Sequence, residues 1–302
     1  MEDMSEARHY PATARDWWQA ARPHTWANAF SPVIAGTGAA AFSDGHHWGR
    51  ALLALIVAWA LIIGVNYAND YSDGIRGTDE DRTGPARLTG GRLADPFHVK
   101  LAAFTAFGVA GVAGIALSLW SAWWLIVFGA LCILAAWFYT GGKNPYGYRG
   151  LGEVAVFVFF GLVAVLGTEF TQSGRVTWVG FALAVAIGSI SASVNLANNI
   201  RDIPSDSETG KITLAVTLGD ARARQLFTTL STVPFVVSVL LIPAFWPAVV
   251  GALASPLVFP GIRRMNQGAT GKELIPVIGS NGKAMLAWSV LTAGALFIGG
   301  LA

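Results

Sequence analysis

The sequence predicts an all-α membrane protein, a bundle of nine transmembrane helices, from three observations. The first is composition: 54% of the 302 residues are hydrophobic, 13% are charged and the mean hydropathy is +0.52, which excludes an ordinary soluble domain and a disordered chain. The second is that apolar residues fall in long blocks, each near the roughly 20 residues that span a bilayer. The third is that charged residues gather between these blocks. The net charge of only +2 gives no reason to expect nucleic-acid binding.

The expected spans follow one another along the chain, each justified by an apolar run bounded by polar or Gly- and Pro-containing loops. Residues 1–22 are charged and lack an apolar stretch, so we expect a cytoplasmic N-terminal segment instead of a cleaved signal peptide. For the seventh and eighth spans a single kinked helix is the alternative, because only residues 243–245 separate them. The nine spans are expected at residues 25–43, 51–68, 101–119, 122–139, 153–170, 177–196, 226–242, 246–260 and 284–301.

The distribution of charge predicts the orientation in the membrane. Eighteen of the 20 Lys and Arg residues fall on one side of the alternating loops, and the exceptions are Arg50 and Arg175. The positive-inside rule places that side, with the N-terminus, in the cytoplasm. Sixteen of the 18 Asp and Glu residues share it. We therefore expect a multi-pass protein of the cell membrane, embedded in the lipid bilayer, whose active site lies in a polar cytoplasmic cap.

Two acidic segments stand out on this side, each at the end of an expected span. In both, Asn and Asp recur with i, i+4 spacing, which places such residues on one face of a helix about 6 Å apart along its axis. One carboxylate at a helix end ordinarily faces water, but two copies in matching positions favour a shared function. The first segment contains Asn66, Asn69, Asp70, Asp73 and Asp79, and the second contains Asn198, Asp202 and Asp206.

The spacing of these segments indicates an internal duplication. Asn69 and Asn198 are 129 positions apart, and so are Asp73 and Asp202. Each segment ends the second span of a four-span set. We therefore expect a single domain over residues 1–302, with pseudo-repeats at about 23–139 and 150–260 and a last helix at about 284–301.

The chemistry of the acidic segments favours a bound divalent cation. Carboxylates that converge at a membrane surface repel each other unless a cation lies among them, and hard oxygen ligands suit Mg²⁺. Because Mg²⁺ keeps positions open for substrate phosphates, the two segments suggest a bridged diphosphate. Cytoplasmic cations available to it are Arg22, Lys143, Arg149, Arg201 and Lys211, although each alone is also explained by the positive-inside rule.

Other functional classes find little support. The chain has no phosphate-binding loop of the Gly-x4-Gly-Lys-Ser/Thr type, no His-Glu-x2-His and no Gly-x-Ser-x-Gly. Its single cysteine, Cys132, excludes an intramolecular disulfide. A CDP-alcohol phosphotransferase would need an Asp-Gly-x2-Ala-Arg run, which the residues after Asp73 do not supply. An ion-coupled transporter remains an alternative from another class, although the spans themselves carry almost no charge.

At the acidic segments the sequence resembles the UbiA superfamily of intramembrane prenyltransferases, and within it the branch that prenylates 1,4-dihydroxy-2-naphthoate. The resemblance runs from about residue 20 to 300. Gly77 stands where the superfamily's first motif has its third carboxylate, and Asp79 is expected to supply it, a departure that the branch shares. The motifs that carry the resemblance are residues 69–79, 81–87 and 198–219, with Arg22-Pro-His-Thr25, Tyr139-Thr-Gly-Gly and Gly150-Leu-Gly-Glu153 in support.

This resemblance implies a helix bundle around a cavity that opens sideways to lipid under a cytoplasmic cap. It implies Mg²⁺-dependent transfer of a polyprenyl group from polyprenyl diphosphate to 1,4-dihydroxy-2-naphthoate, with loss of diphosphate and CO₂, to give demethylmenaquinol in menaquinone biosynthesis. A different acceptor, such as 4-hydroxybenzoate or homogentisate, stays open, as do the prenyl chain length and the oligomeric state.

The resemblance also suggests residue roles. Catalytic roles fall to Asp73, Asp202, Lys143 and Tyr139. Metal ligands would be Asn69, Asp70, Asp73, Asp79, Asn198, Asp202 and Asp206. Diphosphate-binding cations would be Arg82, Lys143, Arg149, Arg201 and Lys211. The aromatic acceptor would contact Arg22, Asn66 and Glu153.

Overall fold

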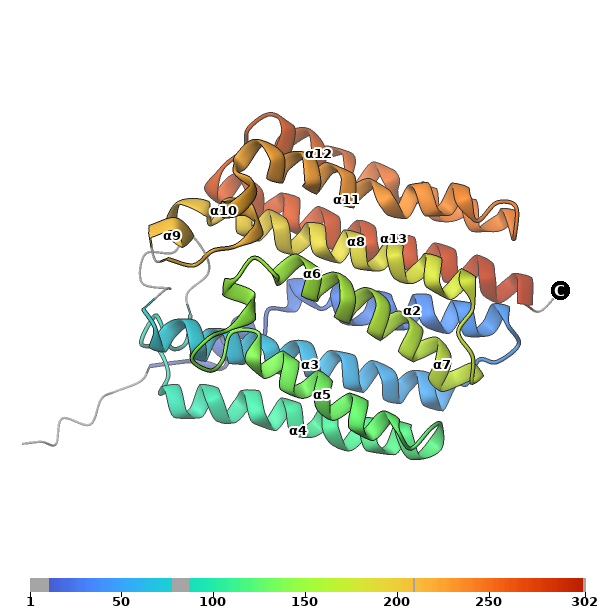
Figure 1. The fold of residues 1–302 in the computed structure, drawn as a ribbon, viewed down its shortest axis with the longest axis horizontal. Helices are drawn as coiled ribbons and strands as arrows, with labels where there is room; N and C mark the ends of the chain where they lie inside the picture. The colour runs from blue at the N-terminus through green and yellow to red at the C-terminus, as the bar shows by residue number, and fades with distance from the viewer. Residues whose placement is uncertain (1–10, 78–86, 209, 301–302) are drawn as a thin grey trace, which may run out of the picture.

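The computed structural model describes residues 11–77, 87–208 and 210–300, and the regular elements of this part of the chain are all helices (Figure 1). The all-α prediction is thereby confirmed for these residues. Six helical segments are long and apolar enough, by length and composition, to cross a membrane. They are α3 (Trp48–Ile75), α4 (Pro96–Trp120), the continuous segment Gly152–Ser173, α8 (Trp178–Arg201), α11 (Asp220–Leu240) and the segment Gly271–Gly299.

Shorter helices occupy the positions of the other expected spans, so the count of nine stays a prediction. These are α2 (Ala27–Phe42), α5 (Leu125–Phe138) and the 3₁₀ helix η4 (Trp246–Leu257), which is followed by α12 (Phe259–Asn266). The segment Gly152–Ser173 consists of α6 (Gly152–Val156), the π-helix η3 (Phe157–Leu166) and α7 (Gly167–Ser173). The remaining elements are α1 (Ala14–Ala20), η1 (Pro23–Thr25), η2 (Tyr146–Tyr148), α9 (Ile203–Glu208), α10 (Leu214–Leu218), η5 (Gly271–Leu274) and α13 (Ile275–Gly300).

Local sequence explains where the long helices begin. Asp95 precedes α4, and its side chain accepts a hydrogen bond from the Phe97 N–H at 2.8 Å, with Pro96 at the first helical position. Thr177 caps α8 in the same way, since its hydroxyl accepts from the Gly180 N–H at 3.0 Å.

The seventh and eighth expected spans are separate helices, so the single kinked helix is wrong. After α11 the backbone turns, and the Phe245 N–H donates to the Leu241 carbonyl at 2.9 Å. Helix η4 then begins at Trp246 with Pro247 in its first turn, where the N–H that proline lacks has no helical partner anyway. α11 and η4 pack against each other as a helical hairpin (Figure 1).

α8 is the central helix of the bundle and packs against η3, α11, α13, α2 and α6. Small residues along it allow close approach, as is common in membrane helices. A Cβ atom on Gly161 of η3 would lie 2.6 Å from the Ala184 carbonyl oxygen and 2.6 Å from the Gly188 Cα of α8. This tight crossing fixes the helix whose end carries the second acidic segment.

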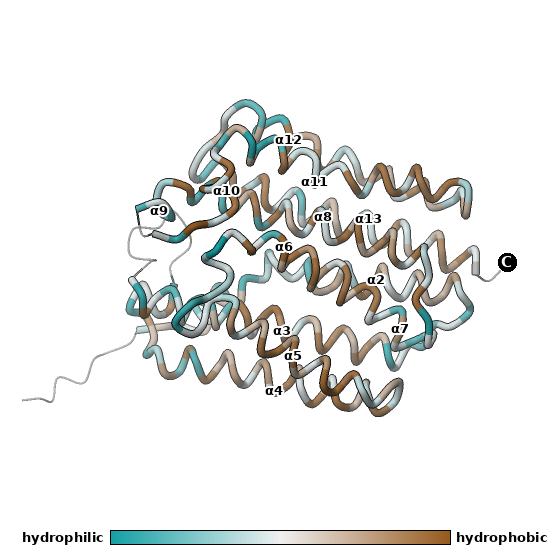
Figure 2. Tube along the Cα trace, viewed as in Figure 1, coloured by the Kyte–Doolittle hydropathy of each residue, from teal (hydrophilic) through white to brown (hydrophobic). Residues whose placement is uncertain are grey.

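Hydrophilic residues concentrate at the end of the bundle that carries α9 and α10, while the helices between the ends are mostly apolar (Figure 2). α1 lies at this polar end, because the Tyr67 hydroxyl of α3 donates to the Trp17 carbonyl at 3.0 Å. Both acidic segments end there as well. The arrangement fits the predicted polar cap, whose location in the cytoplasm stays a prediction.

Candidate active site

An apolar cavity of about 470 Å³ lies between α2, α3, α4, α5, η3 and α8. Its size is in the range of small-molecule sites. Apolar side chains such as Val57, Leu61 and Phe159 form most of its wall. Polar side chains line it toward the polar end of the bundle, and these are Arg22, Thr25, Asn28, Asn66, Asn69, Tyr139, Tyr146, Asn195 and Asn198.

Two of the predicted acceptor residues, Arg22 and Asn66, lie together at this polar end of the cavity. Arg22 adopts a left-handed conformation with φ of 51°, which costs a non-glycine residue about 1 kcal/mol or more. The side-chain amide of Asn66 stabilises this bend, because it donates to the Ala21 carbonyl at 3.0 Å and to the Thr25 hydroxyl at 3.1 Å. The bend directs the chain from α1 into α2 beside the cavity.

Asp70 does not fit the role of metal ligand that the sequence suggested. The carboxylate is fully buried, and its two oxygens accept hydrogen bonds from the backbone N–H groups of Leu88 at 3.0 Å and Thr89 at 2.8 Å. These contacts fix the segment that follows the first motif. Asn66 and Asp70 do share a face of α3, but at Asp70 this face contacts the backbone of Leu88 and Thr89 and has a structural use.

Asn69 and Asp73, on another face of α3, point to the loop that follows α5. The side-chain amide oxygen Oδ1 of Asn69 accepts from the Thr140 hydroxyl at 2.8 Å. Asp73 is 7% exposed, and one of its oxygens accepts from the Tyr148 hydroxyl at 2.5 Å. Its other oxygen lies 3.8 Å from the Arg87 guanidinium. The first motif is thus in contact with two other chain segments, the loop that follows α5 and the segment that contains Arg87.

The second motif forms two ion pairs at the end of α8. The helix ends at Arg201, and the Arg201 guanidinium contacts both oxygens of the adjacent Asp202 at 2.7 Å, with both residues buried. Asp206 lies on α9 and pairs with Lys211 at 3.3 Å. Two cations that were predicted to bind diphosphate are therefore already beside the carboxylates of the motif.

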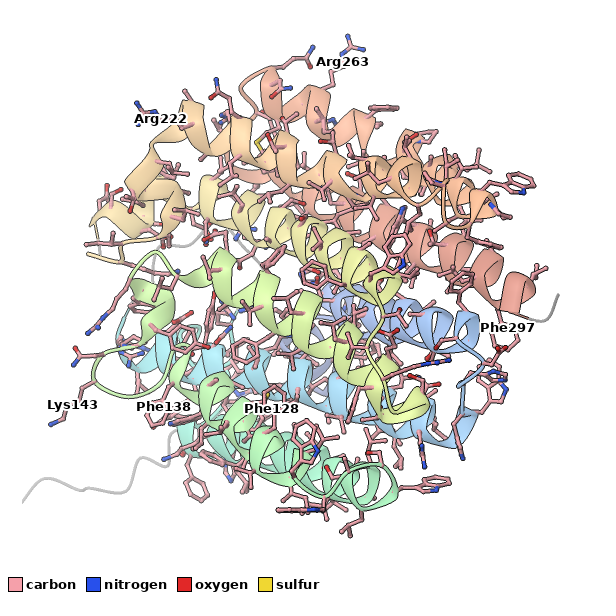
Figure 3. All side chains as sticks on the ribbon, turned by 45° about the vertical axis from the view of Figure 1, so that its right-hand side comes forward. Phe128, Phe138, Lys143, Arg222, Arg263 and Phe297 are labelled. Carbon is pink, nitrogen blue, oxygen red and sulfur yellow. The ribbon has the colours of Figure 1, made fainter. Side chains whose placement is uncertain are left out.

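Lys143 does not converge on the site with the other predicted cations, whereas Arg149 follows Tyr148 in the chain and is bridged to Ile212. Both side chains are exposed on the loop between α5 and α6, and Lys143 extends away from the bundle (Figure 3). The sequence placed them near the diphosphate because they belong to a Gly-rich loop beside Tyr139, but a loop has no periodicity from which a side-chain direction follows. The expected roles of Lys143 in catalysis and diphosphate binding are not supported by this arrangement, and the diphosphate-binding role of Arg149 stays a prediction.

The same loop presents two tyrosines to the cavity. Tyr139, at the end of α5, and Tyr146 stack edge to face with ring centroids 5.4 Å apart. Burial raises the pKa of Tyr146 to about 12, so this phenol stays protonated and donates to the Ala135 carbonyl at 2.9 Å. Tyr139 was predicted from the sequence, whereas Tyr146 was not.

Tyr148 is a second residue of this loop that sequence reasoning missed. Besides its hydrogen bond to Asp73, its ring contacts two cations, with the Arg76 guanidinium carbon and the Lys211 ammonium each 5.5 Å from the ring centroid. The sequence pattern does not distinguish Tyr148 from the other tyrosines of this Gly-rich loop, so these contacts could not be predicted from it. The partners come from α3 and from the segment after α9.

Glu153 lies behind the cavity wall, although the sequence placed it next to the aromatic acceptor. It is 4% exposed, and its Oε1 accepts from the Asn199 amide at 2.6 Å and from the Asn195 amide at 3.4 Å. Its Oε2 is buried without a hydrogen-bond partner among the described residues. Asn195 lines the cavity and Glu153 does not, so Glu153 is connected to the cavity wall through its hydrogen bond with Asn195.

The donor atoms at the polar end fit Mg²⁺ in kind, since they are carboxylate and amide oxygens on two helix ends. Within residues 11–77, 87–208 and 210–300, no three His, Cys, Asp or Glu side chains come together closely enough to hold a metal ion. Asp79 and Arg82, predicted to bind metal and diphosphate, lie outside the described residues. The magnesium site stays a prediction that donor chemistry supports.

Comparison with known proteins gives similarities that agree with one another. Residues 29–290 match the UbiA prenyltransferase family. A 1,4-dihydroxy-2-naphthoate octaprenyltransferase from Mycobacterium tuberculosis is 56% identical over 96% of this chain and 99% of its own length. The Escherichia coli enzyme of that name is 38% identical over 69% of this chain and 70% of its own length.

Solved structures show the same fold. A UbiA homologue from Archaeoglobus fulgidus bound to GPP and Mg²⁺ superimposes with a TM-score of 0.67 at 13% identity, over 94% of this chain and 99% of that one. An apo UbiA homologue from Aeropyrum pernix gives a TM-score of 0.64 at 16% identity, over 90% and 97%. At these identities the likeness concerns the fold alone.

Proposed function

The chain belongs to the UbiA prenyltransferase family, and we propose that it transfers a polyprenyl group from polyprenyl diphosphate to 1,4-dihydroxy-2-naphthoate. The single observation that carries this proposal is the similarity to an enzyme named for that activity, which is 56% identical over 96% of this chain. Membership of the family makes the chain an enzyme, so the ion-coupled transporter considered from the sequence is wrong. The product would be demethylmenaquinol, a precursor of menaquinone.

The cavity and the polar end of the bundle suit the two parts of the donor. A polyprenyl tail needs a hydrocarbon environment, and the cavity wall is largely apolar. The diphosphate needs cations and polar groups, which the ends of α3 and α8 supply. Arg201 and Lys211 lie beside Asp202 and Asp206 and would neutralise phosphate oxygens there. The tail would then extend from the polar end into the bundle.

A bound Mg²⁺ would supply positive charge that stabilises the leaving diphosphate. Asp70 is not included among its ligands, because its oxygens already accept backbone N–H groups. We assign that role to carboxylate and amide side chains at the polar ends of α3 and α8 and on α9. The proposed ligands are Asn69, Asp73, Asn198, Asp202 and Asp206.

The residues of the cavity would protect the allylic cation that forms when the C–O bond breaks. The aromatic rings of Tyr139 and Tyr146 line the cavity near its polar end and offer faces that attract positive charge. The apolar wall excludes water, which would otherwise convert the cation to a prenyl alcohol. Both effects come from side chains that are already in place.

The acceptor would enter at Arg22 and Asn66. Arg22 lies at the polar end of the cavity and is suited to bind the naphthoate carboxylate. The ring carbon that bears the carboxylate then forms a bond to the prenyl carbon, and loss of CO₂ returns the electron pair to the ring. Because the carboxylate starts ionised, this sequence needs no external proton acceptor and releases the hydroquinone, CO₂ and diphosphate.

We further propose that one domain built from two four-helix pseudo-repeats and a ninth helix carries this reaction on the cytoplasmic side of the cell membrane. The placement of both motifs at the same polar end supports this view. It also fits the predicted gathering of basic residues at that end.

Product identification tests the function directly. Purified protein in detergent or nanodiscs would receive Mg²⁺, a prenyl diphosphate and one acceptor at a time, with mass spectrometry of the products. We expect a decarboxylated prenyl product from 1,4-dihydroxy-2-naphthoate. Prenylation of 4-hydroxybenzoate or homogentisate, with none of the naphthoate, would overturn the assignment of the acceptor.

A further inference from the structure

Tyr148 has a fixed place between the two aspartate motifs. It ends the single turn η2, in which the Tyr148 N–H donates to the Pro145 carbonyl at 3.3 Å. The neighbouring Gly147 N–H donates to the Tyr139 carbonyl at 3.0 Å. On the other side Arg149 forms a parallel β-bridge with Ile212. The loop is therefore tied both to the end of α5 and to the segment that follows the second motif.

The ring of Tyr148 attracts one cation from each motif. Arg76 follows α3 and donates to the Thr140 and Gly142 carbonyls of the same loop. Lys211 follows α9 and pairs with Asp206. Each cation lies 5.5 Å from the ring centroid, within the distance at which an aromatic face attracts positive charge.

The hydroxyl of Tyr148 contacts the first motif directly. It donates to Asp73, so one side chain reaches Asp73 through its oxygen and Asp206 through Lys211. Two acidic motifs repel each other across the gap that a diphosphate would fill. A neutral side chain that donates to a carboxylate and holds a cation on its ring offsets this repulsion without adding charge of its own.

We propose that Tyr148 is a positioning residue that joins the two aspartate motifs into one site for the diphosphate of the prenyl donor. Its hydroxyl orients Asp73, and its ring keeps Lys211 and Arg76 facing the space between the motifs. This inference rests on the proposed function, because it assumes a prenyl diphosphate donor. It concerns the donor alone, since Tyr148 does not line the cavity in which the acceptor would react.

Two substitutions separate the contributions of the ring and the hydroxyl. Tyr148→Phe keeps the ring beside both cations and removes the hydrogen bond to Asp73, whereas Tyr148→Leu removes both the ring and the hydrogen bond. Matched controls are Tyr71→Phe and Tyr71→Leu. The Tyr71 ring also contacts a cation, Lys100 at 5.7 Å, but it stacks on Trp137 and is not part of the site.

The first readout is binding of geranyl thiolodiphosphate, an unreactive donor analogue, in the presence of Mg²⁺ and without acceptor. We expect Tyr148→Leu to raise its Kd about tenfold and Tyr148→Phe about threefold. The second readout is turnover, in which the donor KM rises while the acceptor KM stays within about twofold of the wild-type value. Thermal melting in detergent should stay near that of the wild type, and the Tyr71 variants should bind the analogue normally.

Several results would overturn the inference. Wild-type affinity in both Tyr148 variants would do so, as would equal increases in both KM values or a loss of affinity that Tyr71→Leu reproduces. If Tyr148→Leu does not fold, Tyr148→Phe decides the question by itself. The binding measurement needs no acceptor, so a wrong acceptor assignment would appear as missing naphthoate prenylation while the effect of Tyr148 on donor binding remained.

Discussion

Replacement of Glu153 tests how a buried carboxylate serves the cavity. Its Oε1 accepts from Asn199 at 2.6 Å and from Asn195 at 3.4 Å, and Oε2 has no hydrogen-bond partner among the described residues. A glutamine at this position keeps an acceptor for both amides and removes a buried charge. An alanine removes the acceptor altogether. The two variants therefore show whether the protein needs a hydrogen-bond acceptor for these amides or a negative charge at residue 153.

The structure gives the expected magnitudes. Glu153→Ala leaves two half-buried amides without their acceptor. Because water can reach part of each amide, each costs an amount near the low end of about 1–3 kcal/mol, so the free energy of unfolding should fall by about 2–3 kcal/mol. Glu153→Gln loses the charge-assisted part of one short hydrogen bond, about 1 kcal/mol, and is relieved of the larger cost of a buried charge. Its stability should equal or exceed that of the wild type.

Catalytic activity should depend on whether the two amides keep a hydrogen-bond acceptor, and not on the charge of residue 153. Because Glu153 lies behind Asn195, Glu153→Gln should keep kcat/KM for the acceptor within about threefold of wild type, and Glu153→Ala should lose at least about tenfold. Thermal and chemical unfolding in detergent measure the stability, and steady-state kinetics with varied acceptor measure the activity. A well-folded Glu153→Gln variant as inactive as Glu153→Ala would refute this reasoning and return Glu153 to direct contact with the acceptor.

Three further predictions concern other parts of the structure. Gly161→Ala should lower the free energy of unfolding by about 1–3 kcal/mol, because the new Cβ meets backbone of α8 at 2.6 Å, whereas Gly108→Ala, with open space around it, should change thermal melting little. Asp70→Asn should lower the melting temperature, whereas Asp73→Asn should melt like the wild type and lose prenyl transfer. A stable Asp70→Asn variant without activity, together with an unstable Asp73→Asn variant, would contradict the roles assigned to these two residues. Mg²⁺ alone should shift the melting temperature little, and Mg²⁺ with geranyl thiolodiphosphate should raise it, as a ligand that binds only the folded state does.

The elements that the sequence predicts well are those with a clear period or composition. Apolar blocks of about 20 residues predict the long helices, because burial in a bilayer demands both helical backbone and apolar side chains. The i, i+4 spacing also predicts that Asn66 and Asp70 share a face of α3. It does not determine how α3 is rotated, and the rotation turns Asp70 toward the backbone of residues 88 and 89.

Loop residues were harder to predict, for a physical reason. The segment from Tyr139 to Gly152 contains several glycines and a proline, and its side-chain directions depend on contacts with segments that are distant in sequence. Lys143 points away from the bundle, while Tyr148, which the pattern gave no reason to choose, contacts Asp73. The bridge between Arg149 and Ile212, formed by residues far apart in the chain, illustrates why local pattern cannot supply this geometry.

The near-neutral net charge of the sequence has a local counterpart at the polar end. Asp202 pairs with Arg201, Asp206 with Lys211, and Asp73 lies near Arg87 and accepts from Tyr148. These pairs let buried carboxylates fold beside one another without a metal, because each has a cation or a donor in contact. Under the proposed function the same pairs would form the diphosphate site, in which phosphate oxygens would take over the cations and the carboxylates would be available to a metal. Exchange of partners costs less than exposure of bare charges, so a polar end whose carboxylates are already paired with cations can accept a highly charged ligand.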